Sequence, residues 1–387
     1  MRGIRICLRI AVWLVLLATS GVSLAQDVAF ETTAPQAILI DAKSGIVFFE
    51  KNADELIQPA SMSKLMTMTL VFEALKAGDL KVDQEFLISE YAWRHGGSAG
   101  GGSTMYANVN TRIKLIDLMY GSMIQSANDA CIAIAEGMAG SESEFALRMT
   151  KRGRELGLQN AVFKNATGLP DPEHVMSVRD LTILARHIIL DFPEYYKIYS
   201  EKEFTWNNIT QKNRNPLLLE YPGADGMKTG YIKDAGYGMV GSAVRDGRRL
   251  ILVIASLKSI NERKQEAQKL LDWGFRQFKT IDVYAAGEVV SKARVWGGAQ
   301  RWVDLVVKQD LRLALSPQEQ ERVEVKLSYA GPLMAPVKAG DQIGTVRFLM
   351  DGKTIAEVPV ETANAVEAVD SIWSRALDSL MIMALGG

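Results

Sequence analysis

The segment from Ser61 to Ala77 constrains the fold most, because its residues are apolar nearly all round. Pro59 precedes the segment and Gly78 ends it. A helix without a polar face cannot lie on the surface of a domain, so this segment predicts a helix buried at a domain centre. Its methionines are expected to fill the core and not to bind a metal.

The first 25 residues differ in composition from the rest of the chain. They begin with a basic stretch that holds three arginines, and an apolar run follows over residues 10–18. Ser23 and Ala25 then place small residues where a signal peptidase needs them. This order indicates a secretory signal peptide over residues 1–25, with an uncleaved N-terminal anchor as the alternative.

The composition excludes several classes of protein. The chain has 387 residues, of which 44 are basic and 45 acidic, so its net charge of −1 disfavours general nucleic-acid binding. Two cysteines and three histidines leave few ligands for a zinc site, and no metal or cofactor is expected. Because Cys7 lies in the signal, an exported chain keeps only Cys131. It then forms no internal disulfide and depends on a sizeable core.

Helix and strand signals predict an α+β domain over residues 26–281. A hairpin is expected over residues 36–50, and Asp246-Gly247 is a strong turn signal between two later strands. Asn128 and Asp129 are both plausible N-caps. Helices are expected over residues 113–123, 129–138, 177–190 and 262–278.

A glycine-rich stretch over residues 95–104 interrupts this domain. No Gly-Lys-Ser/Thr follows it, so it does not form a phosphate-binding loop. It is expected to be a mobile surface loop, with a lid over a site as the alternative.

The pattern of secondary-structure signals changes after residue 281. Short strand-like runs alternate with turn signals, which predicts a small all-β domain over residues 282–365. The final segment, residues 366–387, returns to helical spacing with Ile372, Trp373 and Leu377 on its apolar side. It suits an amphipathic helix in a membrane surface, and a terminal helix docked on the protein is the alternative. The expected strands of the β-domain are 303–307, 321–327, 342–349 and 354–360.

A Ser-x-x-Lys motif, Ser61-Met62-Ser63-Lys64, starts the buried segment. The spacing of three places Ser61 and Lys64 on one helical face, within side-chain reach. A serine hydroxyl needs a base to become a nucleophile, and the pKa of a desolvated lysine can fall far enough to provide one. Free N–H groups at the helix start also favour a negative acyl oxygen. Taken alone, the motif is weak evidence, and a solvated helix start is the favoured interpretation.

Two further motifs follow in order. In Ser126-Ala127-Asn128, the hydroxyl can relay a proton to a leaving amine, and the amide can orient Lys64. Lys228-Thr229-Gly230 is placed near the start of an edge strand. There its glycine would let a substrate backbone approach, while the lysine and threonine would meet a carboxylate. Each tripeptide is weak evidence alone, and their order carries the information.

The order resembles that of the penicillin-recognising serine enzymes. The surrounding residues are similar to those of serine-type D-alanyl-D-alanine carboxypeptidases, the low-molecular-mass penicillin-binding proteins. The resemblance is strong over about residues 28–280. It implies a β-lactamase-like transpeptidase fold, with an antiparallel sheet flanked by helices, plus an all-β C-terminal domain and a terminal amphipathic helix. The matching stretches are 37–41, 59–64, 125–130, 165–169, 225–230 and 269–275.

The resemblance implies roles in catalysis. Ser61 would be the acyl-ester nucleophile that attacks the penultimate D-Ala of a peptidoglycan stem pentapeptide, and Lys64 would be the general base. Ser126 and Asn128 would assist proton transfer and substrate placement. Water would then hydrolyse the acyl-enzyme after the terminal D-Ala leaves.

The resemblance also implies binding groups and partners. Arg263 would bind the substrate carboxylate, with an exposed helix-start residue as the alternative reading. The expected oxyanion hole consists of the backbone N–H groups of Ser61 and Tyr231. β-Lactams would bind covalently, and the protein would act in cell-wall biogenesis and cell shape, in the periplasm on the outer face of the cytoplasmic membrane. The carboxylate would also meet Lys228, Thr229 and Gly230.

Two departures and three rivals qualify the resemblance. Tyr231 stands where some relatives have His, and residues 107–111 lack the usual glycine-containing turn. A D,D-endopeptidase would share the site. A β-lactamase lacks support because no Glu-x-x-x-Asn pattern lies between the second and third motifs. A non-catalytic wall-binding protein would not need both Ser61 and Lys64.

Overall fold

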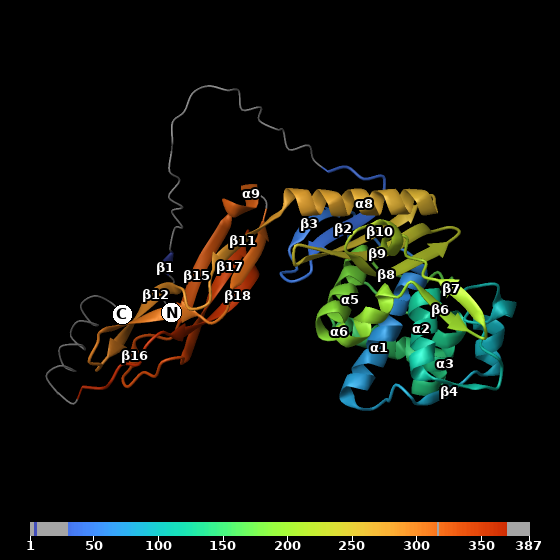
Figure 1. The fold of residues 1–387 in the computed structure, drawn as a ribbon, viewed down its shortest axis with the longest axis horizontal. Coiled ribbons are helices and arrows are strands. Elements are labelled where there is room, and N and C mark those ends of the chain that lie inside the picture. Colours follow the sequence, from blue (N-terminus) through green and yellow to red (C-terminus); the bar gives the residue numbers. More distant parts are fainter. Residues whose placement is uncertain (1–3, 6–29, 316, 370–387) are drawn as a thin grey trace, which may run out of the picture. The chain divides into compact units, whose positions relative to one another are not determined.

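The computed structural model describes residues 4–5, 30–315 and 317–369. The chain divides into two compact units between Arg276 and Gln277 (Figure 1). Nearly all of the expected signal peptide and residues 370–387 of the expected terminal helix lie outside the described residues. Within the described residues, no helix is long and apolar enough to cross a bilayer.

The N-terminal unit is built on a five-stranded antiparallel sheet, as predicted for the fold class. Its strand order is β3-β2-β10-β9-β8, so β8 forms an edge. The predicted hairpin over residues 36–50 is β2 and β3, and Asp246-Gly247 forms the turn between β9 and β10. The strands are β2 (Gln36–Asp41), β3 (Val47–Lys51), β8 (Ala224–Ile232), β9 (Gly236–Arg245) and β10 (Arg248–Leu257).

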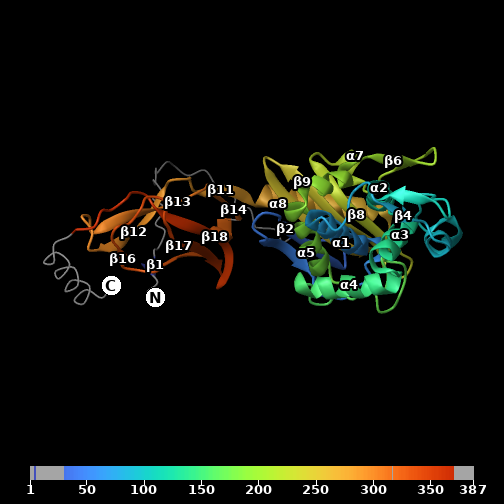
Figure 2. The same cartoon turned by 90° about the horizontal axis from the view of Figure 1, so that it is seen from below.

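Helices cover both faces of this sheet (Figures 1 and 2). One face is covered by α8 (Ile260–Gln277), in which Gly274 lies so close to Leu39 and Leu250 that a Cβ there would approach Leu39 Cδ2 to 2.5 Å. On the other side lie α1 (Lys64–Ala77), α2 (Leu115–Gln125), α3 (Asn128–Ala139), α4 (Glu142–Glu155) and α5 (Val178–Asp191). Short elements complete the unit: β4 (Glu85–Leu87), β5 (Arg112–Lys114), α6 (Pro193–Tyr196), β6 (Glu203–Trp206), β7 (Ile209–Lys212) and α7 (Leu217–Glu220).

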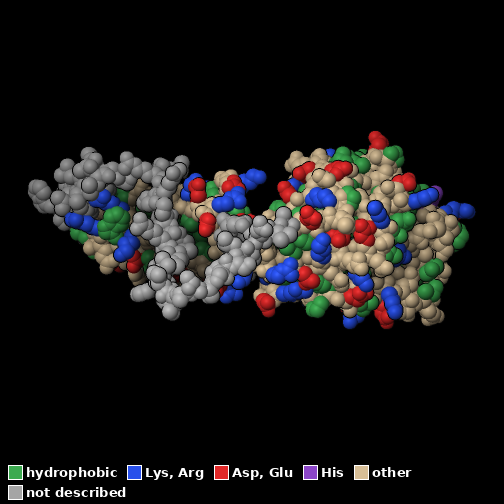
Figure 3. Space-filling view, turned by 90° about the horizontal axis from the view of Figure 1, so that it is seen from above, with side chains coloured by type: hydrophobic (Ala, Val, Ile, Leu, Met, Phe, Trp, Pro, Cys, Tyr) green, Lys and Arg blue, Asp and Glu red, His purple; other side chains and the backbone are tan. Residues whose placement is uncertain are grey.

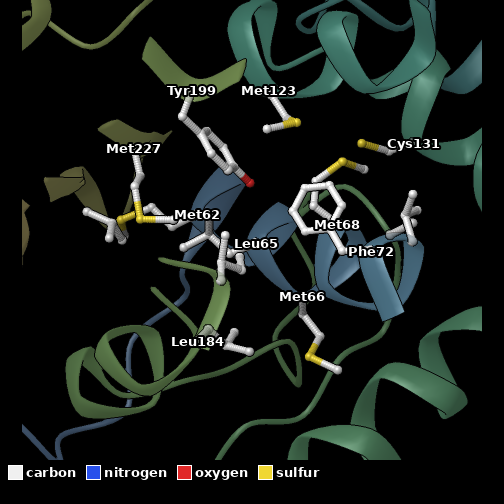
Figure 4. Close-up of a cluster of buried hydrophobic side chains, with 14 of the residues drawn as sticks. Met62, Leu65, Met66, Met68, Phe72, Met123, Cys131, Leu184, Tyr199 and Met227 are labelled. Atoms are coloured by element: carbon white, nitrogen blue, oxygen red, sulfur yellow. The ribbon is translucent and has the colours of Figure 1, made fainter. Parts of the chain in front are cut away.

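The all-round apolar segment forms α1 at the centre of this core, as predicted. Leu65, Met66, Met68 and Phe72 have no exposed surface. Figure 4 shows side chains from several other elements gathered around α1, with the ring of Tyr199 directed into the cluster. Burial of each such side chain contributes roughly 1.5–3 kcal/mol to folding, so the position of α1 is strongly determined.

The structure also explains the start of α5 and the turn over residues 107–111. Ser177 caps α5, where its hydroxyl accepts from the Asp180 N–H and the Asp180 carboxylate accepts from the Ser177 N–H. The stretch over residues 107–111 turns without glycine because Asn110 takes a left-handed conformation with φ of 61°. Asn tolerates this conformation better than most residues.

The C-terminal unit is mainly a β structure, as predicted. Its seven-stranded sheet has the order β1-β15-β17-β18-β13-β12-β16, and β11 pairs with β14 apart from it. Leu305, Phe348 and Val360 are among its buried residues. The elements are β1 (Ile4–Arg5), β11 (Lys279–Tyr284), β12 (Val289–Trp296), β13 (Trp302–Val307), β14 (Leu311–Leu315), α9 (Pro317–Gln320), β15 (Val323–Tyr329), β16 (Leu333–Met334), β17 (Gln342–Met350) and β18 (Lys353–Thr362).

The charged side chains of the N-terminal unit are mixed in sign where α8 forms the surface. Figure 3 shows acidic and basic groups interspersed on that face. Such a surface creates no extended field of one sign, which agrees with the near-zero net charge of the chain.

A cluster of charged side chains joins α1, α4 and α5. The Arg152 guanidinium donates to Glu73, with Nη2 at 2.9 Å from Oε1. His187 contacts Asp191 through Nδ1 at 2.6 Å and Glu73 through Nε2 at 3.3 Å. Contact with Glu73 and Asp191 outweighs burial and raises the pKa of His187 above its ordinary 6.5. Burial opposes ionisation of Glu73, but the hydrogen bonds from His187 and Arg152 lower its pKa.

We predict that His187→Gln lowers stability in a pH-dependent way. A raised pKa in the folded state stabilises the fold fully below about pH 6.5, and this contribution is lost as pH rises through the folded value. The free energy of unfolding should therefore fall by about 1–2 kcal/mol at pH 6, with a smaller loss at pH 9. Urea denaturation at both pH values measures this, with exposed His95→Gln as the control. Equal losses at both pH values would contradict the prediction.

Candidate active site

The Ser-x-x-Lys motif spans the junction of a 3₁₀ turn and α1. Ala60–Ser63 form the turn, and Lys64 is the first residue of α1. Lys64 Nζ lies 2.9 Å from Ser61 Oγ, so the spacing brings the two groups into contact. Ser61 keeps part of its surface exposed, whereas Lys64 is 1% exposed. The Ser61 hydroxyl is thus accessible to a ligand, while the Lys64 amine beside it is shielded from solvent.

The Lys64 amine has two further partners from distant parts of the chain. It donates to Asn128 Oδ1 at 2.7 Å and to the Thr167 carbonyl oxygen at 2.5 Å. Burial, with a smaller contribution from the positive charge of Arg214, lowers the pKa of Lys64 from 10.5 to about 8. A lysine with such a pKa is available as a neutral base near neutral pH.

The second motif connects α2 to α3. Ser126 ends α2 in a left-handed conformation with φ of 65°, and its Oγ accepts from Lys228 Nζ at 2.9 Å. The N-cap of α3 is Ala127, so the expectation that Asn128 or Asp129 caps the helix is wrong. The reason is that the Asn128 side chain binds Lys64, while Asp129 accepts from the Thr104 hydroxyl at 2.6 Å.

The third motif lies on the edge strand β8, in the second half of the strand and not near its start as expected. Lys228 and Thr229 are buried, and Thr229 lines the cavity beside Ser61. Gly230 packs against the serine turn, where a Cβ would lie 2.8 Å from the Pro59 carbonyl oxygen. This packing requires a glycine at that position, in addition to the predicted close approach of a substrate.

A half-buried ion pair holds β8 near its first residues. The Arg249 guanidinium donates to both Asp225 oxygens, at 2.7 and 2.6 Å. The Tyr196 hydroxyl also donates to Asp225, at 2.7 Å. Asp225 opens the stretch that carries Lys228, so these bonds fix the strand on which the third motif lies.

Arg263 is buried, which excludes the alternative of an exposed helix-start residue. Its guanidinium lies over the Tyr237 ring and donates to the Gly238 carbonyl oxygen at a long 3.4 Å. Its Nε has no hydrogen-bond partner. Burial lowers the pKa of Arg263 from 12.5 to about 10. A buried cation with unused donors beside a cavity is suited to bind an anion.

Two open cavities meet at Ser61. One has a volume of about 740 Å³ and is lined by Thr229, Tyr237 and Arg263. The other has a volume of about 480 Å³ and is lined by Leu169, Asp171 and Asp234. Both also contact Gly102, Ser103 and Tyr231, so they form one groove with the serine at its middle.

The glycine-rich stretch lies at the surface, as predicted, with residues 98–102 exposed, and it is anchored at both ends. Gly96 packs on α3, where a Cβ would lie 2.4 Å from the Asp129 nitrogen. The Asn128 N–H donates to the Ser103 carbonyl oxygen at 2.7 Å. One 3₁₀ turn, Ser98–Gly100, lies between these anchors, and Gly102 and Ser103 form part of the groove.

Sequence reasoning missed two contributors to the site. Arg214 lines the larger cavity and donates to Ser103 Oγ at 2.5 Å. The Thr167 carbonyl binds Lys64, whereas the sequence marks the stretch around it only through the family resemblance. A backbone carbonyl leaves no signature in residue type, and Arg214 lies in no recognisable motif.

The described residues hold no group of three or more His, Cys, Asp or Glu side chains that could bind a metal ion. Three cations near Ser61, namely Lys64, Lys228 and Arg263, are buried. Burial lowers the pKa of Lys228 well below its usual value, and the charge of Lys64 adds to this effect. Burial lowers the pKa of Arg214 as well. The groove is therefore suited to bind a negatively charged ligand and to stabilise negative charge that develops during a reaction.

Comparisons with known proteins agree along most of the chain. Residues 22–259 match the family model described as D-alanyl-D-alanine carboxypeptidase, and residues 278–368 match that of the penicillin-binding protein 5 C-terminal domain. The chain is 37% identical to the carboxypeptidase DacA of Haemophilus influenzae, over 94% of this chain and 93% of DacA. It is also 37% identical to DacC of Escherichia coli, over 89% and 87%.

Solved structures give the same result. Penicillin binding protein 5 from Haemophilus influenzae superposes with a TM-score of 0.74 at 37% identity, over 87% of this chain and 98% of that protein. Penicillin-Binding Protein D2 from Listeria monocytogenes, solved in an ampicillin-bound form, superposes with a TM-score of 0.54 at 28% identity. The overlap covers 63% of this chain and 98% of that protein.

We predict that Arg263→Met stabilises the empty protein. The substitution removes a desolvated cation whose Nε has no partner and keeps most of the packing volume. The free energy of unfolding should rise by about 1–2 kcal/mol, as is common when a functional site is relieved of buried charge. Thermal and urea denaturation measure the change. Lys264→Met, which removes the neighbouring cation, is the matched control, and destabilisation by Arg263→Met alone would refute the prediction.

Proposed function

The chain belongs to the D-alanyl-D-alanine carboxypeptidase family, and we propose that Ser61 carries this activity as the acyl-ester nucleophile, with Lys64 as its general base. The enzyme is a serine peptidase that removes the terminal D-Ala from peptidoglycan stem pentapeptides, and it binds penicillin covalently. The single observation that carries the assignment of roles is the set of three contacts made by the Lys64 amine.

These contacts suit a neutral amine. Asn128 Oδ1 and the Thr167 carbonyl can only accept, so they take the two N–H groups of neutral Lys64. When the amine is neutral, its lone pair is left for the Ser61 hydroxyl, whose oxygen lies 2.9 Å from Nζ and which can then donate to it. The arrangement thus favours proton transfer from Ser61 to Lys64 as the serine oxygen attacks the carbonyl carbon of the penultimate D-Ala.

The leaving amine needs a proton after the attack. Ser126 stands between Lys228, whose Nζ is 2.9 Å from its Oγ, and the cavity beside Ser61. It can therefore pass a proton toward the nitrogen of the departing D-Ala, while Asn128 holds Lys64 and the substrate amide in place. Water then hydrolyses the ester on Ser61, and Lys64 is placed to take the proton of that water.

The larger cavity suits the terminal D-Ala. Thr229 and Arg263 line it, and Lys228 is buried next to it, so a carboxylate there would meet a hydroxyl and two cations. Gly230 keeps β8 close to the serine turn. The backbone N–H groups of Ser61 and Tyr231 would bind the oxyanion, and the exposed Tyr231 ring stacks on Tyr237 at 4.3 Å.

The deciding experiment compares the protein with Ser61→Ala. Fluorescent penicillin should label the first protein covalently and not the second. Mass spectrometry of a pentapeptide digest should show release of one D-Ala that depends on Ser61. Persistent labelling of Ser61→Ala would refute the nucleophile. Cleavage only of a crosslinked D,D-peptide, with the pentapeptide intact, would identify the endopeptidase alternative.

We propose further that the protein is exported and acts in the periplasm, on the outer face of the cytoplasmic membrane. The signal-like pattern over residues 1–25 and the apolar side of the final segment support this, as does a substrate that belongs to the cell wall. Only Arg375 is basic among residues 370–387, so apolar burial must supply most of the membrane affinity.

Deletion of residues 370–387 should therefore move the protein from the membrane fraction to the soluble fraction. Penicillin labelling should be unchanged, because the groove lies wholly within the N-terminal unit. Fractionation followed by labelling measures both properties. Unchanged partitioning would instead favour a retained N-terminal anchor or a tail docked on the protein.

A further inference from the structure

Glu142 is a half-buried carboxylate near the active site that has no part in the mechanism above. It is the first residue of α4. Its Oε1 accepts from the Ala166 N–H at 3.0 Å, and its Oε2 accepts from the Tyr91 hydroxyl at 3.1 Å. Burial raises its pKa, and these two hydrogen bonds oppose that rise. Among the residues that line the groove at Ser61, Glu142 does not occur.

Ala166, whose N–H donates to Glu142, belongs to the same loop as Thr167, whose carbonyl accepts from Lys64. In this loop Asn165 Oδ1 accepts from the Gly168 N–H at 2.7 Å and from the Thr167 N–H at 3.1 Å. The resulting tight turn presents the Thr167 carbonyl to Lys64. The loop also packs on the serine turn, since a Cβ at Gly168 would lie 1.9 Å from the Ala60 carbonyl oxygen.

The Ala166 peptide is the point where this loop is held to the helices. Its carbonyl accepts from Thr67 Oγ1 of α1 at 2.7 Å, and its N–H donates to Glu142 of α4. The next carbonyl in the chain is that of Thr167, which binds Lys64. Loss of the Glu142 contact would leave a buried N–H without a partner and free the loop on one side.

We propose that Glu142 is a positioning residue for acylation, which clamps the Ala166 peptide so that the Thr167 carbonyl stays in place against the Lys64 amine, and whose charge acts on that amine. This proposal rests on the assignment of Lys64 as the base. It requires no contact between Glu142 and the substrate, because Glu142 acts through the loop.

The charge of Glu142 is one of several that act on the amine. Asp129 and Glu142 favour the charged form of Lys64, and Arg214 favours the neutral form. Cys131 lies close as well, and its pKa is raised by burial. The charged and titratable groups around Glu142 itself are Tyr91, just before the turn Ala92–Gly96, Glu136 of α3 and Lys64 of α1.

Two substitutions separate the two parts of the role. Glu142→Gln keeps an oxygen that can accept from the Ala166 N–H but removes the charge. The pH midpoint of acylation should then move to lower pH, with a plateau rate within about 3-fold of the unmodified protein. Glu142→Ala removes the clamp as well. Its plateau rate should fall about 10- to 100-fold, because small misplacements of catalytic groups cost that much.

The experiment measures the rate of acylation by fluorescent penicillin from pH 6 to 10 on the full chain, together with the thermal midpoint. Glu144→Gln, an exposed acid on the same helical turn, should leave both the rate and the pH midpoint unchanged. A purely structural role would lower the thermal midpoint of Glu142→Ala without altering the rate or the pH midpoint of the folded fraction. That result would overturn the proposal, as would equal rates in Glu142→Ala and Glu142→Gln.

Lys64→Arg distinguishes this proposal from the one on which it rests. If Lys64→Arg is labelled at the normal rate, Lys64 is not the base, and the positioning role proposed for Glu142 fails with it. If Lys64→Arg is inactive while Glu142→Ala retains the normal rate and midpoint, the base assignment stands and only the positioning role is refuted. A shifted midpoint in Glu142→Gln with a reduced plateau in Glu142→Ala supports both.

Discussion

The burial of the Lys64 amine is the interaction on which the rest of the catalytic unit depends. A lysine amine taken out of water must be surrounded by polar groups, or its cost would exceed what the fold can support. Here the polar groups come from the serine turn, from the start of α3 and from the loop that carries Thr167. These segments are distant in sequence, so the amine can be satisfied only when the helices around α1 are packed. The Lys64 amine therefore acquires its hydrogen-bond partners only when the catalytic unit folds.

Three buried cations, Lys64, Lys228 and Arg263, lie at the groove. Lys228, Arg214 and Arg263 all have a lowered pKa because of burial, and Arg263 leaves its Nε without a partner. Burial of these cations lowers the stability of the folded protein, and binding of an anion stabilises it. A terminal carboxylate and a developing oxyanion both supply negative charge, so the ligand and the reaction relieve what the fold leaves uncompensated.

Support for the reacting groups comes from a second set of contacts behind them. Arg249 and Tyr196 hold Asp225 at the start of β8, and Gly230 lets the same strand press against the serine turn. On the opposite side, Thr67 and Glu142 hold the Ala166 peptide. Each contact restrains a backbone segment and not a reacting atom. The positions of the reacting groups thus result from strands and loops that are fixed at both sides.

The sequence by itself determined the central helix, the β hairpins, most helix positions and the three motifs, because burial leaves a periodic pattern and catalysis needs particular residue types. The order of those motifs also led to the correct family. Only the tertiary structure decided that Asn128 binds Lys64 and leaves the N-cap of α3 to Ala127, that Gly230 serves packing, and that Arg263 is buried. It alone revealed Thr167, Arg214 and Glu142. Backbone carbonyls carry no residue signature, and the effect of a charge depends on distances that are set only when segments far apart in the chain pack together.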